Sequence, residues 1–174
     1  MKEELMQILK GREERANEQK KIISKTNSTL ISFTVNTPGL EKNNDRIKNI
    51  FEKEIYEIKK SLKDKGLEIK YEKSNIGKVS GPEGFISVSE KAEVIKEMTV
   101  VIEENSPIGR LFDIDVLDLE GKPISRNTLN KEPRKCIVCG ENAKHCSRSR
   151  KHPIEEVIDK FYKIYEYNLG GSNG

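Results

Sequence analysis

The sequence predicts an α+β fold in which helices and strands alternate, with a cysteine-rich segment before the last helix. Apolar residues recur at helical spacing in four long segments. Shorter segments between them alternate apolar and polar residues, as strands do, and Pro or Gly residues separate the segments. No internal repeat or linker divides the chain. We therefore expect one domain over residues 1–169, and a disordered tail over the Gly-rich residues 170–174.

Composition and charge exclude several classes of protein. The chain has 174 residues, of which 34% are hydrophobic and 35% charged, and it contains no Trp. No apolar run approaches the ~20 residues that span a bilayer, and the charged N-terminus lacks the apolar segment of a signal peptide. Three cysteines, an odd number, favour a reducing cytoplasm over a secreted disulfide scaffold. We expect a cytoplasmic protein that has no membrane partner.

The first predicted helix has an unusual inward face. Its apolar positions are Leu5, Ile8, Leu9, Ala16 and Ile23. The same stripe also includes Arg12 and Gln19, and Arg15 lies near its edge. An arginine that faces inward needs an anionic partner, either a protein carboxylate or a bound ligand. The alternative is that the helix breaks at Gly11 and turns the arginines outward.

The remaining elements follow in a regular order. Strands are predicted over 29–36, 67–73, 85–88 and 111–119, and the first of them should be half-buried. Asn44 or Asp45 should cap a helix that ends at Gly66, Ser89 should open the next, and the last helix carries an apolar stripe from Ile154 to Tyr165. The resulting βαββαβ order is the ferredoxin-like or polymerase-palm arrangement, and a nucleotidyltransferase-type sheet is the alternative.

Paired aspartates are the sharpest local feature. Asp113 and Asp115 lie two residues apart on a predicted strand, so their carboxylates share a face. Parallel carboxylates repel each other unless a cation lies between them, and nucleotidyl and phosphoryl transferases hold Mg²⁺ in this way. Arg110 adds a cation where phosphates would lie, and Glu68 or Glu72 could supply a third carboxylate. The competing interpretation is an ordinary solvent-facing strand, on which alternating aspartates are common.

Cysteines and a histidine form a second candidate site. Cys136, Cys139, Cys146 and His152 follow one another with two, six and five residues between them. Four such ligands suffice for a tetrahedral Zn²⁺ site. His145 is the alternative fourth ligand. Three ordinary reduced cysteines, or a redox-active CxxC pair, are the competing interpretations.

Positive charge is concentrated in the same part of the chain. Residues 126–152 hold eight basic and two acidic residues, whereas the whole chain carries only +3. Arg148, Arg150 and His152 could bind phosphate groups, although the charge alone favours a solvated surface. A general base for an attacking hydroxyl is another possible role for His152. The overall charge is too small for a general nucleic-acid binder.

Five motifs in order resemble one family. GREERANEQ, TLISFTVNTPG, SGPEG, SPIGRLFDIDVLD and RKCIVCGENAKHCSRSRKH resemble the holo-acyl-carrier-protein synthases of citrate lyase, the apo-citrate lyase phosphoribosyl-dephospho-CoA transferases. The resemblance runs from about Gly11 to the final helix. It implies that a serine of the citrate lyase acyl carrier subunit attacks 2′-(5″-triphosphoribosyl)-3′-dephospho-CoA and that pyrophosphate leaves.

The resemblance also implies roles for the residues singled out above. Asp113 and Asp115 would hold Mg²⁺ on the triphosphate, and Arg110, Arg148 and Arg150 would steady the phosphates. The remaining implied phosphate-binding or donor-approaching positions are Arg12, Arg15, Gly81 and His152.

Three other functions remain open from the sequence. The same donor could serve a malonate decarboxylase carrier instead. The cysteine knuckle and the local charge also fit a small zinc-binding nucleic-acid module. A non-catalytic assembly protein could dock an acidic carrier through the basic segment. The nucleic-acid module leaves the paired aspartates unexplained, so we expect no nucleic-acid partner.

Overall fold

The computed structural model of the chain describes residues 1–172. Its centre is a four-stranded antiparallel sheet in the order β2-β3-β1-β4. The strands are β1 (Thr29–Val35), β2 (Ile69–Asn75), β3 (Glu83–Val88) and β4 (Phe112–Leu117). The helices are α1 (Lys2–Thr26), α2 (Asp45–Asp64), α3 (Ala92–Asn105), α4 (Ala143–Ser149) and α5 (Ile154–Leu169). The predicted α+β class is confirmed.

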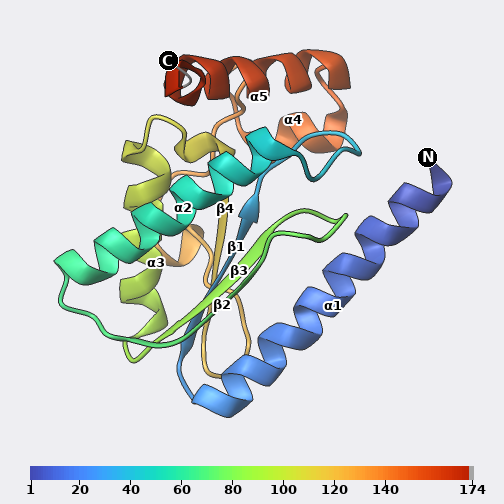
Figure 1. The fold of residues 1–174 in the computed structure, drawn as a ribbon. Coiled ribbons are helices and arrows are strands. Elements are labelled where there is room, and N and C mark those ends of the chain that lie inside the picture. Colours follow the sequence, from blue (N-terminus) through green and yellow to red (C-terminus); the bar gives the residue numbers. More distant parts are fainter. Residues whose placement is uncertain (173–174) are drawn as a thin grey trace.

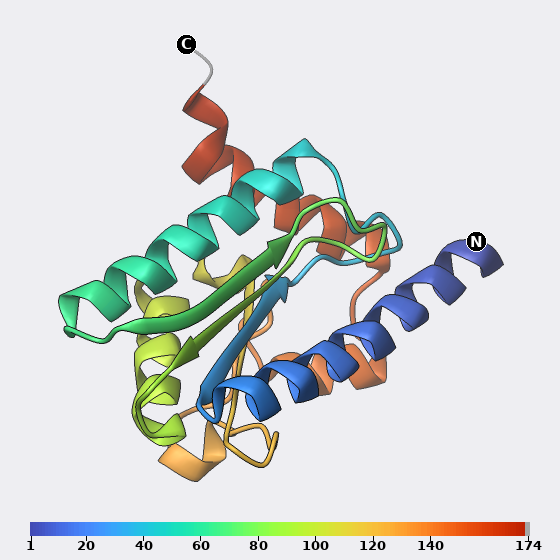
Figure 2. The ribbon, with the colours of Figure 1, turned by 60° about the horizontal axis from the view of Figure 1, so that its bottom comes forward.

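Helices cover both faces of the sheet. Figures 1 and 2 show α1 on one side and α2 with α3 on the other. Ile31 and Phe33 of β1 join the main core under α2 and α3, while Leu30 joins a smaller cluster with Ile22 and Ile23 of α1. The prediction of a half-buried first strand is therefore wrong: β1 lies between two helical layers and is buried on both sides.

Helix α1 is continuous through Gly11, so the predicted alternative of a break at this residue is wrong. Gly11 is buried against Ser80, and a Cβ at residue 11 would overlap that side chain. Leu5 and Leu9, predicted to face the core, are each 48% exposed. The reason is visible in Figure 1, where the N-terminal end of α1 extends past the sheet.

Element boundaries shift where turns compete with strands or helices. The side chain of Asn44 caps α2, accepting from the backbone N–H of Ile47 at 2.9 Å. Ser89 does not open the next helix, because α3 begins three residues later and Lys91 precedes it. The last strand is shorter than predicted, since a 3₁₀ turn occupies Gly109–Leu111 and a turn follows at Asp118.

The ends of the described chain complete the fold. Gly170–Ser172 form a 3₁₀ turn after α5, and the last two residues of the expected tail, 173 and 174, lie outside the described residues. No helix within residues 1–172 combines the length and the apolar character that crossing a bilayer requires.

Candidate functional site

Two carboxylates project from β4 toward the α1 side of the sheet. Asp113 lies opposite Thr34 of β1, and Asp115 lies opposite Ser32. The alternate β4 residues, including Ile114, enter the core beneath α2 and α3. The Thr34 hydroxyl donates to Asp113 Oδ2 at 3.4 Å. The predicted sharing of one face is thus confirmed, and the role of the pair stays a prediction.

The charge of Asp113 opposes ionisation of Asp115. Loss of solvent around the carboxylate raises the pKa of Asp115, and the charge of Asp113 raises it further. The charges of Lys96 and Arg15 act in the opposite direction. The Asp113 side chain is 49% exposed, and its Oδ1 lies 3.8 Å from Nη1 of Arg134. A cation between the carboxylates would relieve this repulsion. The arrangement therefore fits a divalent ion bound by carboxylate oxygen atoms.

Helix α1 brings positive charge to the same face. Arg15 is close enough to favour the charged form of Asp115. Arg12 is exposed and lies beside Lys42, whose pKa is lowered first by burial and then by the Arg12 charge. Neither arginine is buried as an inward-facing helix stripe would require. Cations that crowd one another next to an open face favour a bound anion. Lys42 could not be predicted for this site, because it lies in a loop with no periodic pattern.

A third carboxylate on this face comes from β3. Glu83 lies opposite Thr34 on the side away from Asp113, so the three residues form one row across the sheet. Glu83 is buried, its Oε1 is 2.7 Å from the Lys78 ammonium, and its Oε2 has no hydrogen-bond partner within the described chain. The predicted candidate Glu72 is wrong, because it pairs with Lys59 of α2 on the opposite face.

The other predicted candidate for the third carboxylate, Glu68, is also wrong, because it is exposed and lies before β2. Glu83 stands in the SGPEG motif, which was the one available signal for it. Gly81 in that motif has φ +103°, and a Cβ there would lie 2.9 Å from the Lys42 carbonyl oxygen. Its absent side chain thus lets this turn pack on the loop that carries Lys42.

Arg110 is not brought to the aspartate pair. Its side chain lies beside α5, where it lines a cleft with Lys160 and Lys163. Burial, together with the neighbouring charge of Arg134, lowers the pKa of Arg110 to about 10. The ion contact of Asp113 is with Arg134, at 3.8 Å, rather than with Arg110.

Charged side chains seal the outer edge of β4. Arg134 Nη2 donates to the Phe112 carbonyl at 2.6 Å, and Lys96 Nζ donates to the Ile114 carbonyl at 3.2 Å. Glu54 of α2 accepts from the Asp113 N–H at 3.2 Å. Such contacts satisfy backbone groups that an edge strand leaves unpaired. Glu54 occupies a core position of the α2 stripe, where a charged residue is not expected from the sequence.

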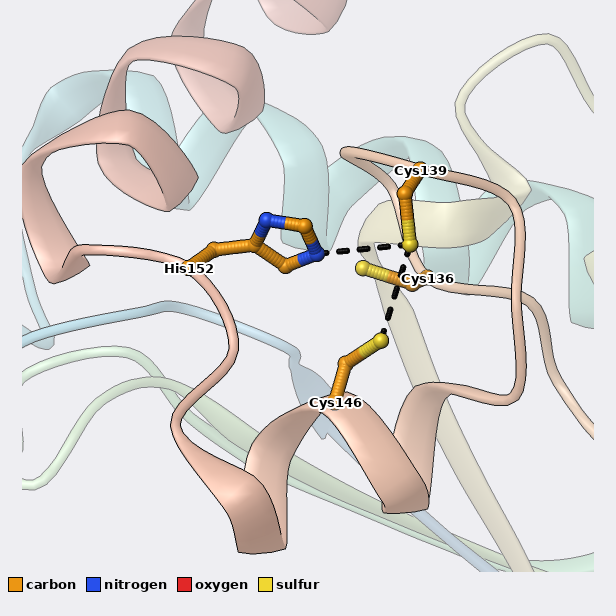
Figure 3. A group of neighbouring side chains, drawn as sticks. All are labelled: Cys136, Cys139, Cys146 and His152. Atoms are coloured by element: carbon orange, nitrogen blue, oxygen red, sulfur yellow. Dashed lines mark hydrogen bonds between the residues drawn. The ribbon is translucent and has the colours of Figure 1, made fainter.

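The cysteine-rich segment forms a compact cluster. Figure 3 shows Cys136 and Cys139 on a loop, Cys146 on α4, and His152 on the segment before α5, all converging on one point. Their ligand atoms all lie within 4.8 Å of one another. The Gly140 N–H donates to the Cys136 carbonyl at 2.9 Å, which closes a tight knuckle around the first two sulfur atoms.

The distances in the cluster fit a tetrahedral metal ion. Zn–S bonds of ~2.3 Å place two sulfur ligands roughly 3.8 Å apart. Cys139 Sγ lies 3.6 Å from Cys146 Sγ and 3.3 Å from His152 Nε2. The other ring nitrogen of His152 lies 3.8 Å from the Glu156 carboxylate, the kind of contact that orients a metal-bound imidazole.

Ionisation in the cluster is uneven. Burial opposes ionisation of Cys136, but hydrogen bonds from the N–H groups of Cys139 and Val138, together with those from the Cys146 and Cys139 thiols, lower its pKa. Burial and the two neighbouring thiols raise the pKa of Cys146 to about 11. Three sulfur atoms packed around one point repel as thiolates unless a cation joins them.

The other predicted residues of this segment lie outside the cluster. His145, the alternative fourth ligand, is exposed on α4 and lines a shallow surface depression with Arg148. Arg150 is exposed and ends α4 with φ +48°. The structure therefore assigns His152 rather than His145 to the cluster, and it leaves Arg148 and Arg150 on the protein surface.

Comparison with known proteins gives a consistent result. A family profile described as apo-citrate lyase phosphoribosyl-dephospho-CoA transferase matches residues 3–168. An Escherichia coli protein of that name is 32% identical over 154 residues, which cover 88% of this chain and 84% of the relative. The similarly named protein of Shigella boydii matches with the same identity and coverage. Protein CitXG of Haemophilus influenzae is 34% identical over 158 residues, 90% of this chain but 34% of that longer protein.

Proposed function

Because the chain belongs to the apo-citrate lyase phosphoribosyl-dephospho-CoA transferase family, we propose that it attaches this group to the acyl carrier subunit of citrate lyase. The donor is the 2′-(5″-triphosphoribosyl)-3′-dephospho-CoA precursor. A seryl oxygen of the carrier forms a bond to the phosphorus next to the ribose as the hydroxyl loses its proton. The bond from that phosphorus to pyrophosphate breaks. The family match, which spans both candidate sites, is the observation that carries this proposal.

The α1 side of β4 is the proposed reaction site. Asp113 and Asp115 would hold Mg²⁺, which neutralises charge on the triphosphate when it is bound. Their mutual repulsion and open position support this assignment. Arg12, Arg15 and Lys42 lie on the flank of the same face, where their charges would bind the phosphate oxygens. Thr34 would orient the Asp113 carboxylate through its hydroxyl.

The cysteine cluster is the proposed zinc site. Its three sulfur atoms and one imidazole are the ligand set of a closed, structural Zn²⁺ centre. Zinc there would fix the loop from which Arg134 reaches the edge of β4. Because such thiolates require a reducing environment, we also propose that the protein works in the cytoplasm.

We also propose a topology for the sheet. The order β1-α2-β2-β3-α3-β4 and the strand sequence β2-β3-β1-β4 support a ferredoxin-like or palm-like arrangement over a nucleotidyltransferase-type sheet. In this arrangement the aspartates lie on the strand next to the first one, on the face opposite α2 and α3.

Transfer can be measured directly by the intact mass of the apo carrier subunit. The carrier is incubated with the protein, the triphosphoribosyl donor and Mg²⁺, and the expected gain equals the donor minus pyrophosphate. Asp113→Asn should lower the rate at least about 100-fold, since it removes a metal ligand without changing shape. Asp64→Asn removes the same charge from an exposed site at the end of α2 and should leave the rate unchanged.

The acceptor is tested in parallel. A malonate decarboxylase carrier given the same donor should be modified far more slowly than the citrate lyase carrier. Preference for the malonate decarboxylase carrier would change the acceptor and keep the chemistry. An unmodified carrier of either kind, with donor and carriers shown competent on another synthase, would contradict the proposed function.

A further inference from the structure

A cleft between α5 and the turn before β4 is separate from the aspartate face. It has a volume of about 490 Å³, within the range of small-molecule sites, and its lining includes Arg110, Lys160 and Lys163 but no acidic residue. Pro107 and Ile164 add apolar surface. Figure 1 shows α5 along the top of the molecule, at the end opposite to the C-terminal end of α1.

Positive charge in this cleft is incompletely neutralised. Arg110 Nη1 is buried and has no hydrogen-bond partner in the part of the chain that the structure describes. Its pKa is lowered by burial and by Arg134, which shows that its charge is poorly compensated. Lys163 has an ion pair with Asp159 at 2.7 Å, but both side chains are more than half exposed, so a ligand can displace it at little cost.

An aromatic and an amide side chain complete the cleft. Tyr167 is 91% exposed, which is unusual for a large side chain that lines a cleft. Asn168 stands beside it at the same rim. An exposed tyrosine ring offers a stacking surface for a planar base, and an amide can donate to or accept from its edge. The three cations can bind phosphate groups, and the aromatic ring can stack on a base. Together they match the chemistry of a nucleotide.

We infer that this cleft binds the adenosine diphosphate portion of the donor, with Arg110, Lys160 and Lys163 on the phosphates and Tyr167 on the base. The identity of the nucleotide rests on the proposed function. Arg110 and Asp113 are three residues apart in the chain, so their Cα atoms are separated by at most about 11 Å. Helix α5 packs on the α2 and α3 side through Phe161 and Tyr165, so a donor anchored there would pass around the start of β4 to bring its triphosphate end to the aspartates. Arg110 is then a binding residue for the nucleotide.

Calorimetric titration with dephospho-CoA, without carrier or Mg²⁺, tests this inference apart from transfer. Lys160→Ala combined with Lys163→Ala should weaken binding roughly tenfold or more, and Tyr167→Ala should weaken it by a smaller factor. The matched control is Lys60→Ala combined with Lys63→Ala, which removes two lysines at the same spacing from α2. Inorganic pyrophosphate, which lacks the base, should bind the cleft more weakly than dephospho-CoA and should be insensitive to Tyr167→Ala.

Several results would overturn the assignment of this cleft to the nucleotide. Equal losses in the two double variants, or none in either, would overturn the inference. Pyrophosphate binding as tight as that of dephospho-CoA would reduce the cleft to a simple anion site and also overturn it. Weaker carrier binding with unchanged dephospho-CoA binding would make α5 a carrier-docking surface instead. If wild-type protein fails to modify the carrier while the cleft variants still lose dephospho-CoA, the inference holds and the proposed function fails.

Discussion

The two faces of the central sheet differ although the same strands build them. On the α2 and α3 side, Phe33 stacks on Phe51 with ring centres 5.4 Å apart, inside the main core. On the α1 side, the neighbouring residues Ser32 and Thr34 contact Gln19 and Asp113. Helix α1 has few buried residues, which are Ile22 and Ile23 near its C-terminal end and Ile8 and Gly11 in its N-terminal half. Stability thus comes mainly from one face, and the other is left polar enough for chemistry.

The largest expected effect is a difference in unfolding free energy between substitutions on the two faces of the sheet. Phe33→Ala should cost about 3–5 kcal/mol of unfolding free energy, because it empties a buried ring position. Thr34→Ala, one residue away, should cost about 1 kcal/mol or less but should slow transfer, since Asp113 loses its hydroxyl partner. Urea denaturation and the carrier mass assay measure the two quantities. Equal destabilisation by both variants would contradict the division between the faces.

The cysteine cluster should give the next largest effect. Cys139→Ser removes one ligand and should abolish a stoichiometric zinc signal in elemental analysis. It should also lower stability by about 2–3 kcal/mol, or roughly 5–10 °C in Tm, because the loop that carries Arg134 loses its anchor. Ser147→Ala on the exposed surface of α4 is the control. Purified protein without zinc, and with an unchanged Tm after Cys139→Ser, would assign the cysteines no metal-binding role.

A smaller effect is expected at the contact between Gly11 of α1 and Ser80. Gly11→Ala places a Cβ where the Ser80 side chain lies, so α1 must shift. We expect a loss of about 1–2 kcal/mol, because the clash outweighs the better helix propensity of Ala. Ser80→Gly in the same chain should restore stability. A clear gain in stability from Gly11→Ala alone would show that the close approach is not required.

The sequence predicted what depends on local periodicity. The shared face of Asp113 and Asp115 follows from strand alternation, and the cysteine cluster follows from ligand spacing. The failures depend on sheet order and tertiary packing. Glu72 pointed to the wrong face because the register of β2 against β3 is not a local property. Glu83 and Lys42 reach the site only through strand pairing and loop packing. Arg110 lies beside α5, which begins more than forty residues later in the chain.

The smallest expected effect concerns Glu54, the one carboxyl among the buried apolar residues of α2. Glu54 is fully buried, and burial followed by the Asp113 charge raises its pKa well above the usual value. The folded protein therefore keeps a proton that the unfolded chain releases above about pH 4.3, so stability falls as the pH rises from there toward the raised pKa. Glu54→Gln cannot ionise and keeps an oxygen for the Asp113 N–H.

The variant should match wild type near pH 4 and become more stable than it by a few degrees in Tm at neutral pH, with the gap widening as pH rises. Thermal unfolding between pH 4 and pH 8 measures this gap, and Glu52→Gln on the exposed side of α2 is the control. Parallel pH profiles for wild type and Glu54→Gln would mean that Glu54 ionises normally when folded. In that case the buried face would tolerate a charge directly behind Asp113, and the contrast between the two faces of the sheet would rest on packing alone.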